Sequence, residues 1–400
     1  MQTDQRNYLI ITCCYWVFTL TDGAIRMLVV LYFHRLGYSP FEVAMLFLFY
    51  EFFGIVTNLI GGWLATRMGL NLTMHIGMAL QIVALLMLAV PESWLAVAYV
   101  MFAQALSGIA KDLNKMSAKT GVKMLVNDKN DSQLFSWVTM LTGSKNALKG
   151  VGFFLGSALL EFVGFQNAML ILAGALLAAL ISAMLHLPRG LGKIETQPKF
   201  LRIFSNTPSI KGLSLARFFL FGARDIWFVV GLPLFLFSTL GWHLSRVGAF
   251  LALWLIVYGI IQSSTPLFLK KQHHGHGPSG KTAQLWAGIL VLVPASIALA
   301  LQQGLEANRV IIVGLILFGA IFAINSAVHS YLVVAWSEAD KVAMNLGFYY
   351  MANAGGRLTG TVLSGWIYQT QGLVACLWGS AVFVLIAALI PLRAPRKTQG

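Results

Sequence analysis

Apolar segments of membrane-spanning length follow one another along the whole chain, separated by short polar loops. An α-helix needs about 20 apolar residues to cross the hydrocarbon core of a bilayer, and it satisfies its own backbone hydrogen bonds there. The pattern therefore predicts an all-α membrane protein with twelve transmembrane helices. They are expected at residues 8–33, 41–65, 71–90, 94–116, 134–160, 167–187, 212–237, 245–269, 283–302, 309–335, 342–368 and 372–391.

The composition supports this class. Hydrophobic residues make up 58% of the chain and charged residues 10%, whereas about a quarter of the residues in a soluble domain are charged. The first span carries Asp22 and Arg26 in its middle, is too long for a signal peptide and lacks a small-residue cleavage pattern. We therefore expect this span to stay in the mature protein.

The net charge of +14 is spread unequally over the loops once these are assigned alternately to the two sides of the membrane. Eighteen Lys and Arg residues, including Lys115 at the end of a span, fall on the side of the termini, against three on the other side and seven deep within spans. Loops rich in Lys and Arg stay in the cytoplasm. The distribution predicts a multi-pass protein of the inner (cytoplasmic) membrane with both termini cytoplasmic. The lipid bilayer then accounts for the basic charge, and nucleic acid is not expected as a partner.

Seven basic residues and four acids lie deep inside the predicted spans, away from their ends. On insertion scales a charge at the centre of a bilayer costs about 2.5–3.5 kcal/mol, so buried charges normally line a water-filled cavity or meet an opposite charge. The surplus of positive charge predicts a carrier whose substrate is an anion. The cations are Arg26, Lys111, Lys145, Lys149, Arg217, Arg224 and Arg357, and the acids are Asp22, Glu51, Asp112 and Asp225.

Helical spacing indicates how some of these charges are arranged. Asp22 and Arg26 stand one turn apart, so an internal ion pair and exposure to a cavity are both open interpretations. Neighbouring residues on a helix diverge by about 100°. Arg224 is therefore not expected on the same face as Asp225, and at least one of the two should have a partner elsewhere.

Two features favour direct binding of an anion. Lys145 and Lys149 share one face of a span that contains no acid, so both are expected to have no acidic partner. Arg357 is the predicted clamp of the second half, because guanidinium binds phosphate-like oxygens in bidentate fashion. The predicted substrate-binding residues are Arg26, Lys111, Lys145, Lys149, Arg224, Arg357, Asn325 and Asn353, and the candidate proton-coupling residues are Asp22, Glu51, Asp112 and Asp225.

Nothing in the spacing of nucleophiles, bases or metal ligands predicts an enzyme. The three cysteines lie within spans, and glycine and proline interrupt the histidines of residues 273–278. We expect no catalytic residues, no cofactor and no metal, and without an ATP-binding motif the energy should come from an ion gradient or the membrane potential. A membrane-embedded hydrolase or transferase and a non-transporting scaffold are the alternative classes.

The chain shows a sign of internal duplication. Leu36-Gly37-Tyr38 after the first span matches Leu240-Gly241-Trp242 after the seventh, at an offset of 204 residues. Six spans, a basic linker and six more spans resemble the major facilitator superfamily, which implies two pseudo-symmetric six-helix bundles working by alternating access. The expected boundaries are 1–187 for the N-terminal bundle, 188–211 for a cytoplasmic basic linker, 212–392 for the C-terminal bundle and 393–400 for a cytoplasmic tail.

The loop and charge patterns bear on this resemblance. Residues 62–69 lie where the superfamily has the motif G-x-x-x-D-R-x-G-R-R, with Thr66 in place of the acid, and Gln104 replaces the arginine of an R-x-x-x-G pattern common in proton-coupled drug exporters. Spans three, six, nine and twelve contain no Lys, Arg, Asp or Glu in their interiors. The resemblance implies that these four spans face lipid, while the charged spans line the cavity.

Four stretches of the first half resemble the organoarsenical efflux permeases of the ArsJ family: residues 15–26, 50–54, 108–113 and 143–150. The resemblance implies export of 1-arseno-3-phosphoglycerate, and hence arsenate resistance that depends on a glyceraldehyde-3-phosphate dehydrogenase using arsenate in place of phosphate. A pentavalent arsenic ester is bound through oxygen and needs no clustered thiolates. The alternatives are another organic-anion or organophosphate exchanger, or a proton-coupled drug exporter.

Overall fold

The computed structural model describes residues 3–68, 70–125, 131–187, 207–272, 278–337 and 342–393. Every regular element in these ranges is helical, which confirms the predicted all-α class. The predicted tail and most of the predicted linker lie outside the described residues. The elements are α1 (Thr3–Arg35), α2 (Pro40–Met45), α3 (Leu48–Met68), α4 (Leu70–Leu88), η1 (Glu92–Trp94), α5 (Val97–Leu125), α6 (Asp131–Phe162), α7 (Phe165–His186), α8 (Pro208–Phe228), α9 (Gly231–Leu234), the π-helical η3 (Phe235–Thr239), α10 (Leu244–Gln272), α11 (Gly280–Gln302), α12 (Ala307–Ala335) and α13 (Val342–Leu389).

The helices correspond to the predicted spans with local breaks. The second span is divided into α2 and α3, and α13 contains the last two predicted spans. Gly372 separates these two, because its φ of 77° lies in the left-handed region that glycine adopts without strain. Within the described ranges, nine helices are long and apolar enough to cross a membrane, and one of these nine is the interrupted stretch Asn345–Leu389. The chain is a multi-pass membrane protein, and the count of twelve spans is consistent with these helices.

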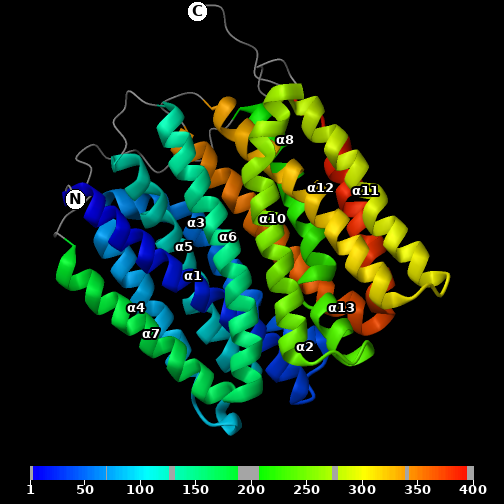
Figure 1. Cartoon of the computed structure of the whole chain (residues 1–400), viewed down its shortest axis with the longest axis horizontal. Helices are drawn as coiled ribbons and strands as arrows, with labels where there is room; N and C mark the ends of the chain where they lie inside the picture. Colours follow the sequence, from blue (N-terminus) through cyan, green and yellow to red (C-terminus); the bar gives the residue numbers. More distant parts are fainter. Residues whose placement is uncertain are drawn as a thin grey trace, which may run out of the picture. The chain divides into compact units, whose positions relative to one another are not determined.

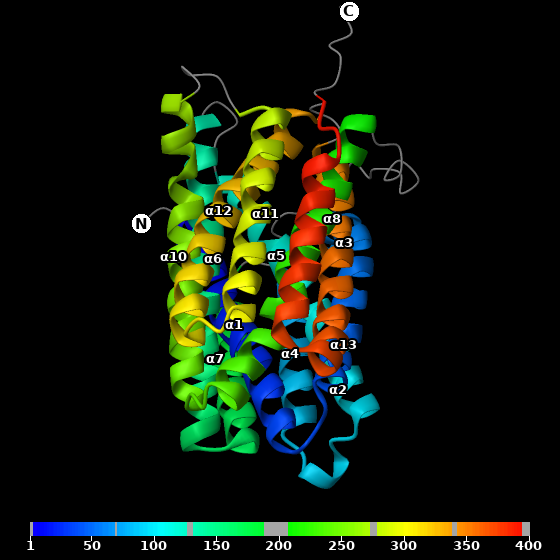
Figure 2. The same ribbon diagram turned by 90° about the vertical axis from the view of Figure 1, so that its right-hand side faces the viewer.

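The chain divides into two compact units, each assembled from separate stretches of sequence. The first contains Met1–Tyr38, Met45–Lys199 and Trp242–Gly259, and the second contains Ser39–Ala44, Phe200–Gly241 and Ile260–Gly400. Figure 1 shows α1 beside α6 within the first unit, and in Figure 2 α8 runs beside α13 within the second. The start of α10 is tied to the first unit, where the Ser245 N–H donates to Glu161 Oε2 at 2.9 Å.

Glycines allow unusually close helix packing in both units. In the first unit, a Cβ on Gly152 or Gly156 would collide with the α1 backbone, at Leu20 and Ala24. In the second unit, Gly356 and Gly360 lie equally close to the α8 backbone. The two glycine pairs are 204 residues apart, the same offset as the repeat detected in the loops. Small residues let helix backbones approach closely within a membrane, and both units use this contact.

We expect Gly356→Ala to destabilise the protein by about 1–3 kcal/mol, because the new methyl group overlaps the backbone carbonyl of Phe218. The matched control is Gly174→Ala in α7, where a Cβ meets nothing within 4 Å. That variant should be neutral or more stable, by up to about 1 kcal/mol. Thermal unfolding in detergent compares the two, and equal stability of both variants would contradict the close-packing argument.

Candidate functional site

The first unit buries an ionic cluster where α1, α3 and α5 meet. Arg26 Nη2 lies 2.7 Å from Glu51 Oε1, and the Glu51 side chain is fully buried. Lys111 Nζ approaches both Glu51 Oε2, at 4.0 Å, and Asp112 Oδ2, at 3.9 Å. The Arg26 guanidinium also lies over the rings of Phe47 and Tyr50. Three predicted site residues, Arg26, Glu51 and Lys111, are therefore brought together.

Asp22 lies in the same region, but its partners differ from Arg26, the partner that the helical spacing suggested. The Tyr50 hydroxyl donates to Asp22 Oδ1 at 2.5 Å, and Lys149 Nζ lies 3.6 Å from Asp22 Oδ2. The expectation that Lys149 has no acidic partner is wrong, because the close contact of Gly23 with Gly152 brings α6 against α1. The possible pairing of Asp22 with Arg26 is replaced by the pairs Asp22–Lys149 and Arg26–Glu51.

Lys115 extends the cluster along α5. Its ammonium lies 2.5 Å from Asp112 Oδ1 and donates to Asn58 Oδ1 at 2.5 Å. Lys115 was expected on the cytoplasmic side with the loop cations, but it lies in α5 as a largely buried partner of Asp112. The signal that was available is the three-residue spacing of Asp112 and Lys115, which puts them on one face of a helix.

The second unit holds two guanidinium groups on one carboxylate. Arg224 Nη2 lies 2.5 Å from Asp225 Oδ1, and Arg357 Nε lies 3.2 Å from Asp225 Oδ2. The two residues were expected on different faces of the helix, and a direct contact between them was not foreseen. Their Cβ directions diverge, but the long arginine side chain folds back to the carboxylate. Asp225 also has the partner elsewhere that was expected, since Arg357 comes from α13.

Arg217 is a buried cation of α8 that was not among the predicted substrate-binding residues. Its Nε donates to Asn353 Oδ1 at 3.1 Å, and its Nη1 donates to the hydroxyl and carbonyl oxygens of Ser326 at 3.0 and 3.4 Å. The guanidinium carbon stacks 3.8 Å from the ring centroid of Phe221. Among the described residues, all of these partners are neutral.

The remaining predicted site residues have different environments. Asn353 binds Arg217, whereas buried Asn325 makes no side-chain hydrogen bond to any described residue. Lys145 is half-buried on α6, one turn from Lys149. Within the described ranges, no group of three or more His, Cys, Asp or Glu residues is placed to hold a metal ion.

Positive charge exceeds negative charge in both clusters. The first combines four cations, Arg26, Lys111, Lys115 and Lys149, with three carboxylates, Asp22, Glu51 and Asp112. The second combines three guanidinium groups with the single carboxylate of Asp225 among the described residues. Most of the cations are paired, but each carboxylate other than Asp22 is shared by two of them. The net charge of each cluster, counted over these residues, is therefore positive.

Comparisons with known proteins identify the family and the fold. Residues 11–331 match the sequence model of the Major Facilitator Superfamily. The chain is similar to a POT family transporter solved in complex with a thioalcohol-conjugated peptide, at 13% identity and a TM-score of 0.78 over 97% of this chain and 98% of that chain. It is also similar to a POT family transporter in complex with 5-aminolevulinic acid, at 14% identity and a TM-score of 0.77 over 96% and 95%. A search of the curated proteins finds no match. At these identities the structural likeness is one of fold.

We expect Asp225→Asn to destabilise the protein by about 3 kcal/mol, because two buried guanidinium groups lose their shared carboxylate. Adding Arg224→Gln should restore part of the loss, since it removes one of the unpaired charges. Glu306→Gln is the control: Glu306 pairs with Arg309 at an exposed position, where a salt bridge contributes about 1 kcal/mol or less. Additive losses in the double variant, measured by thermal unfolding, would exclude this pairing as the cause.

Proposed function

Because the chain belongs to the Major Facilitator Superfamily, we propose that it is a secondary carrier that moves a small organic anion across the membrane by alternating access. The chain is a membrane transporter by its family. The anionic nature of the substrate is supported by one observation: in each unit the cluster of paired ionic side chains, all of them at least largely buried, contains more cations than carboxylates. A cavity lined by positive charge attracts anions and disfavours cations.

The substrate that we propose is 1-arseno-3-phosphoglycerate, exported from the cytoplasm. This identity is supported by the resemblance of residues 15–26, 50–54, 108–113 and 143–150 to the organoarsenical efflux permeases. The molecule carries an oxyanion at each end. Cations such as Lys149 or Arg357 suit an oxyanion of this kind, and guanidinium offers it bidentate bonds. Export protects the cell if a glyceraldehyde-3-phosphate dehydrogenase makes the ester from arsenate.

In this proposal, a substrate oxyanion binds a cation by replacing the carboxylate that is paired with it. An oxyanion that binds Arg224 and Arg357 competes with Asp225, and one that binds Lys149 competes with Asp22. A carboxylate that loses its cation takes up a proton more readily, because the nearby positive charge had favoured the ionised form. Asp22, Glu51, Asp112 and Asp225 are therefore the candidate sites at which a proton couples to substrate.

The carboxylates of the first cluster favour a second candidate function, transport of a small zwitterion. The POT family transporters named above were solved with a peptide conjugate and with 5-aminolevulinic acid. A ligand with both an amino and a carboxylate group would use carboxylates as well as cations, and the first cluster holds three carboxylates. A carrier of small zwitterions is thus the rival that the experiments must separate from a carrier of organic anions.

Transport into inverted vesicles tests the proposed substrate. Vesicles containing the protein should accumulate label from radiolabelled glyceraldehyde 3-phosphate only when arsenate, the dehydrogenase and its nicotinamide cofactor are all present. Vesicles without the protein are the control, and the assay is repeated with and without a pH gradient. Exchange of organophosphates independent of arsenate would replace the substrate by another anion. Accumulation of 5-aminolevulinic acid or a dipeptide would favour the zwitterion carrier.

Lys149→Gln should lower transport at least tenfold, because it removes a cation proposed to bind substrate. The double variant Asp22→Asn/Lys149→Gln removes both charges of the pair. It should regain stability but not transport, whereas recovery of transport would show that Lys149 serves only to neutralise Asp22. Lys281→Gln, at an exposed position near the start of α11, is the matched control and should transport normally.

A further inference from the structure

Arg217 is buried and charged, and its charge meets no carboxylate among the described residues. Only 5% of the residue is exposed. Its hydrogen bonds use Nε and Nη1, with Asn353 and Ser326 as acceptors, and Nη2 makes no hydrogen bond to the described residues. A buried charge normally has a counter-charge because desolvation of an unpaired ion is unfavourable. This guanidinium therefore retains both its positive charge and a pair of N–H donors for a ligand.

Other polar groups of the same part of α12 are also unsatisfied. The amide N and O of Asn325 and the Nδ1 of His329 are buried and have no hydrogen-bond partner among the described residues. Arg217 interacts electrostatically with His329 and directly with Ser326, one turn before it. Asn325 is four residues before His329, so the two share a face of α12. Buried polar groups are hydrogen-bonded in most proteins, and an unsatisfied cluster calls for a specific explanation.

The hydroxyl of Ser326 holds this region in place. It accepts hydrogen bonds from Arg217 Nη1 at 3.0 Å and from Gln262 Nε2 at 3.2 Å. The ring of Phe221 covers one face of the guanidinium, and the ring centroid of Tyr349 lies 5.1 Å from its Cζ. The Arg217 head is thus fixed in orientation by α8, α10, α12 and α13 before any ligand binds.

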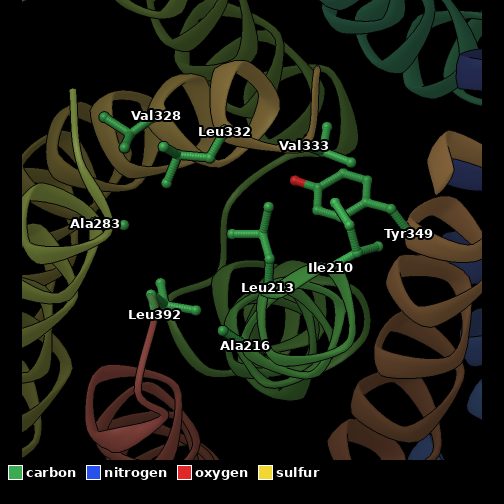
Figure 3. Close-up of a cluster of buried hydrophobic side chains, with 9 residues drawn as sticks. All are labelled: Ile210, Leu213, Ala216, Ala283, Val328, Leu332, Val333, Tyr349 and Leu392. Atoms are coloured by element: carbon green, nitrogen blue, oxygen red, sulfur yellow. The ribbon is translucent and has the colours of Figure 1, made fainter. Parts of the chain in front are cut away.

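An apolar cluster adjoins Arg217 along α8. Figure 3 shows Ile210 and Leu213 of α8 close to the ring of Tyr349, with Val333 nearby on α12. Ala216, the residue before Arg217, belongs to the same cluster. Apolar packing of this kind lowers the local dielectric, which strengthens the attraction between a guanidinium and an anion.

We propose that Arg217, with Asn325 and His329, forms an oxyanion-binding subsite in the second unit. The ligand class is a phosphate, arsenate or carboxylate group, which accepts hydrogen bonds from several donors at once. The subsite deepens the proposed function and rests on it, since it would hold one charged end of the anionic substrate. It adjoins the Arg224–Asp225–Arg357 group, since the guanidinium groups of Arg217 and Arg224 both lie over the ring of Phe221, but it is centred on the guanidinium that has no carboxylate partner among the described residues.

The test measures binding of inorganic phosphate and of 3-phosphoglycerate to the purified full-length protein in detergent, by calorimetry at constant ionic strength. Arg217→Gln should weaken binding of both probes at least tenfold. Arg309→Gln removes an exposed arginine and serves as the matched control. Wild-type affinity in Arg217→Gln would overturn the subsite and leave Arg217 as a structural residue.

Asn325→Leu addresses a possible folding defect of the first variant. The Asn325 amide makes no hydrogen bond to a described residue. Replacing it with an apolar residue of similar size therefore removes no described hydrogen bond. We expect the variant to fold and to bind phosphate more weakly, by at least threefold. Gln81→Leu in α4 is its control, because Gln81 is another buried amide without a described partner. Equal phosphate affinity of Asn325→Leu and Gln81→Leu would overturn the proposal.

These measurements separate the subsite from the substrate assignment. Loss of phosphate binding in Arg217→Gln, together with vesicles that show no arsenate-dependent transport, supports the subsite and rejects the arsenical ester. Arsenate-dependent transport by the wild type, together with unchanged phosphate binding in Arg217→Gln, supports the ester and rejects the subsite.

Discussion

Charge buried at membrane depth is tolerated only where it is neutralised or hydrogen-bonded, and this requirement organises the interior of the protein. Carboxylates are shared: Asp225 serves Arg224 and Arg357, and Asp112 serves Lys111 and Lys115. Each of these cations is thereby partly neutralised, while the net charge of each group of side chains stays positive. A fully paired interior would be more stable but would offer an anion no attraction.

The ion pairs depend on the glycine contacts that bring their helices together. A Cβ on Gly23 would lie 2.7 Å from the carbonyl oxygen of Lys149, and one on Gly360 would lie 2.9 Å from the Cβ of Asp225. The charged pairs Asp22–Lys149 and Asp225–Arg357 therefore lie directly beside close approaches between helices in each unit. Because the same contact holds the helices and positions the charges, a change in helix packing would alter both pairs.

The fold could be predicted from the sequence because apolar length and loop spacing determine it locally, and the family match and the helices confirm it. Ion pairing could not be predicted in the same way. Lys149 and Asp22 are 127 residues apart, and only the packing of α6 on α1 joins them. Arg224 was misjudged because helical direction was applied to Cβ and not to the reach of a long side chain. Arg217 gave no sequence signal beyond its presence in a span, since its neutral partners come from distant helices.

The paired state of the cations also bears on how a carrier releases its substrate. A carrier must bind its substrate on one side and release it on the other, so its affinity cannot be very high in both conformations. If Asp225 takes back the guanidinium groups as the substrate leaves, the interior never contains two cations without a counter-anion. The net binding free energy is then the difference between two ionic interactions, and it stays modest although each interaction alone is strong. Arg217 has no such internal anion among the described residues, and its neutral partners would leave the stronger and more selective contact to the substrate.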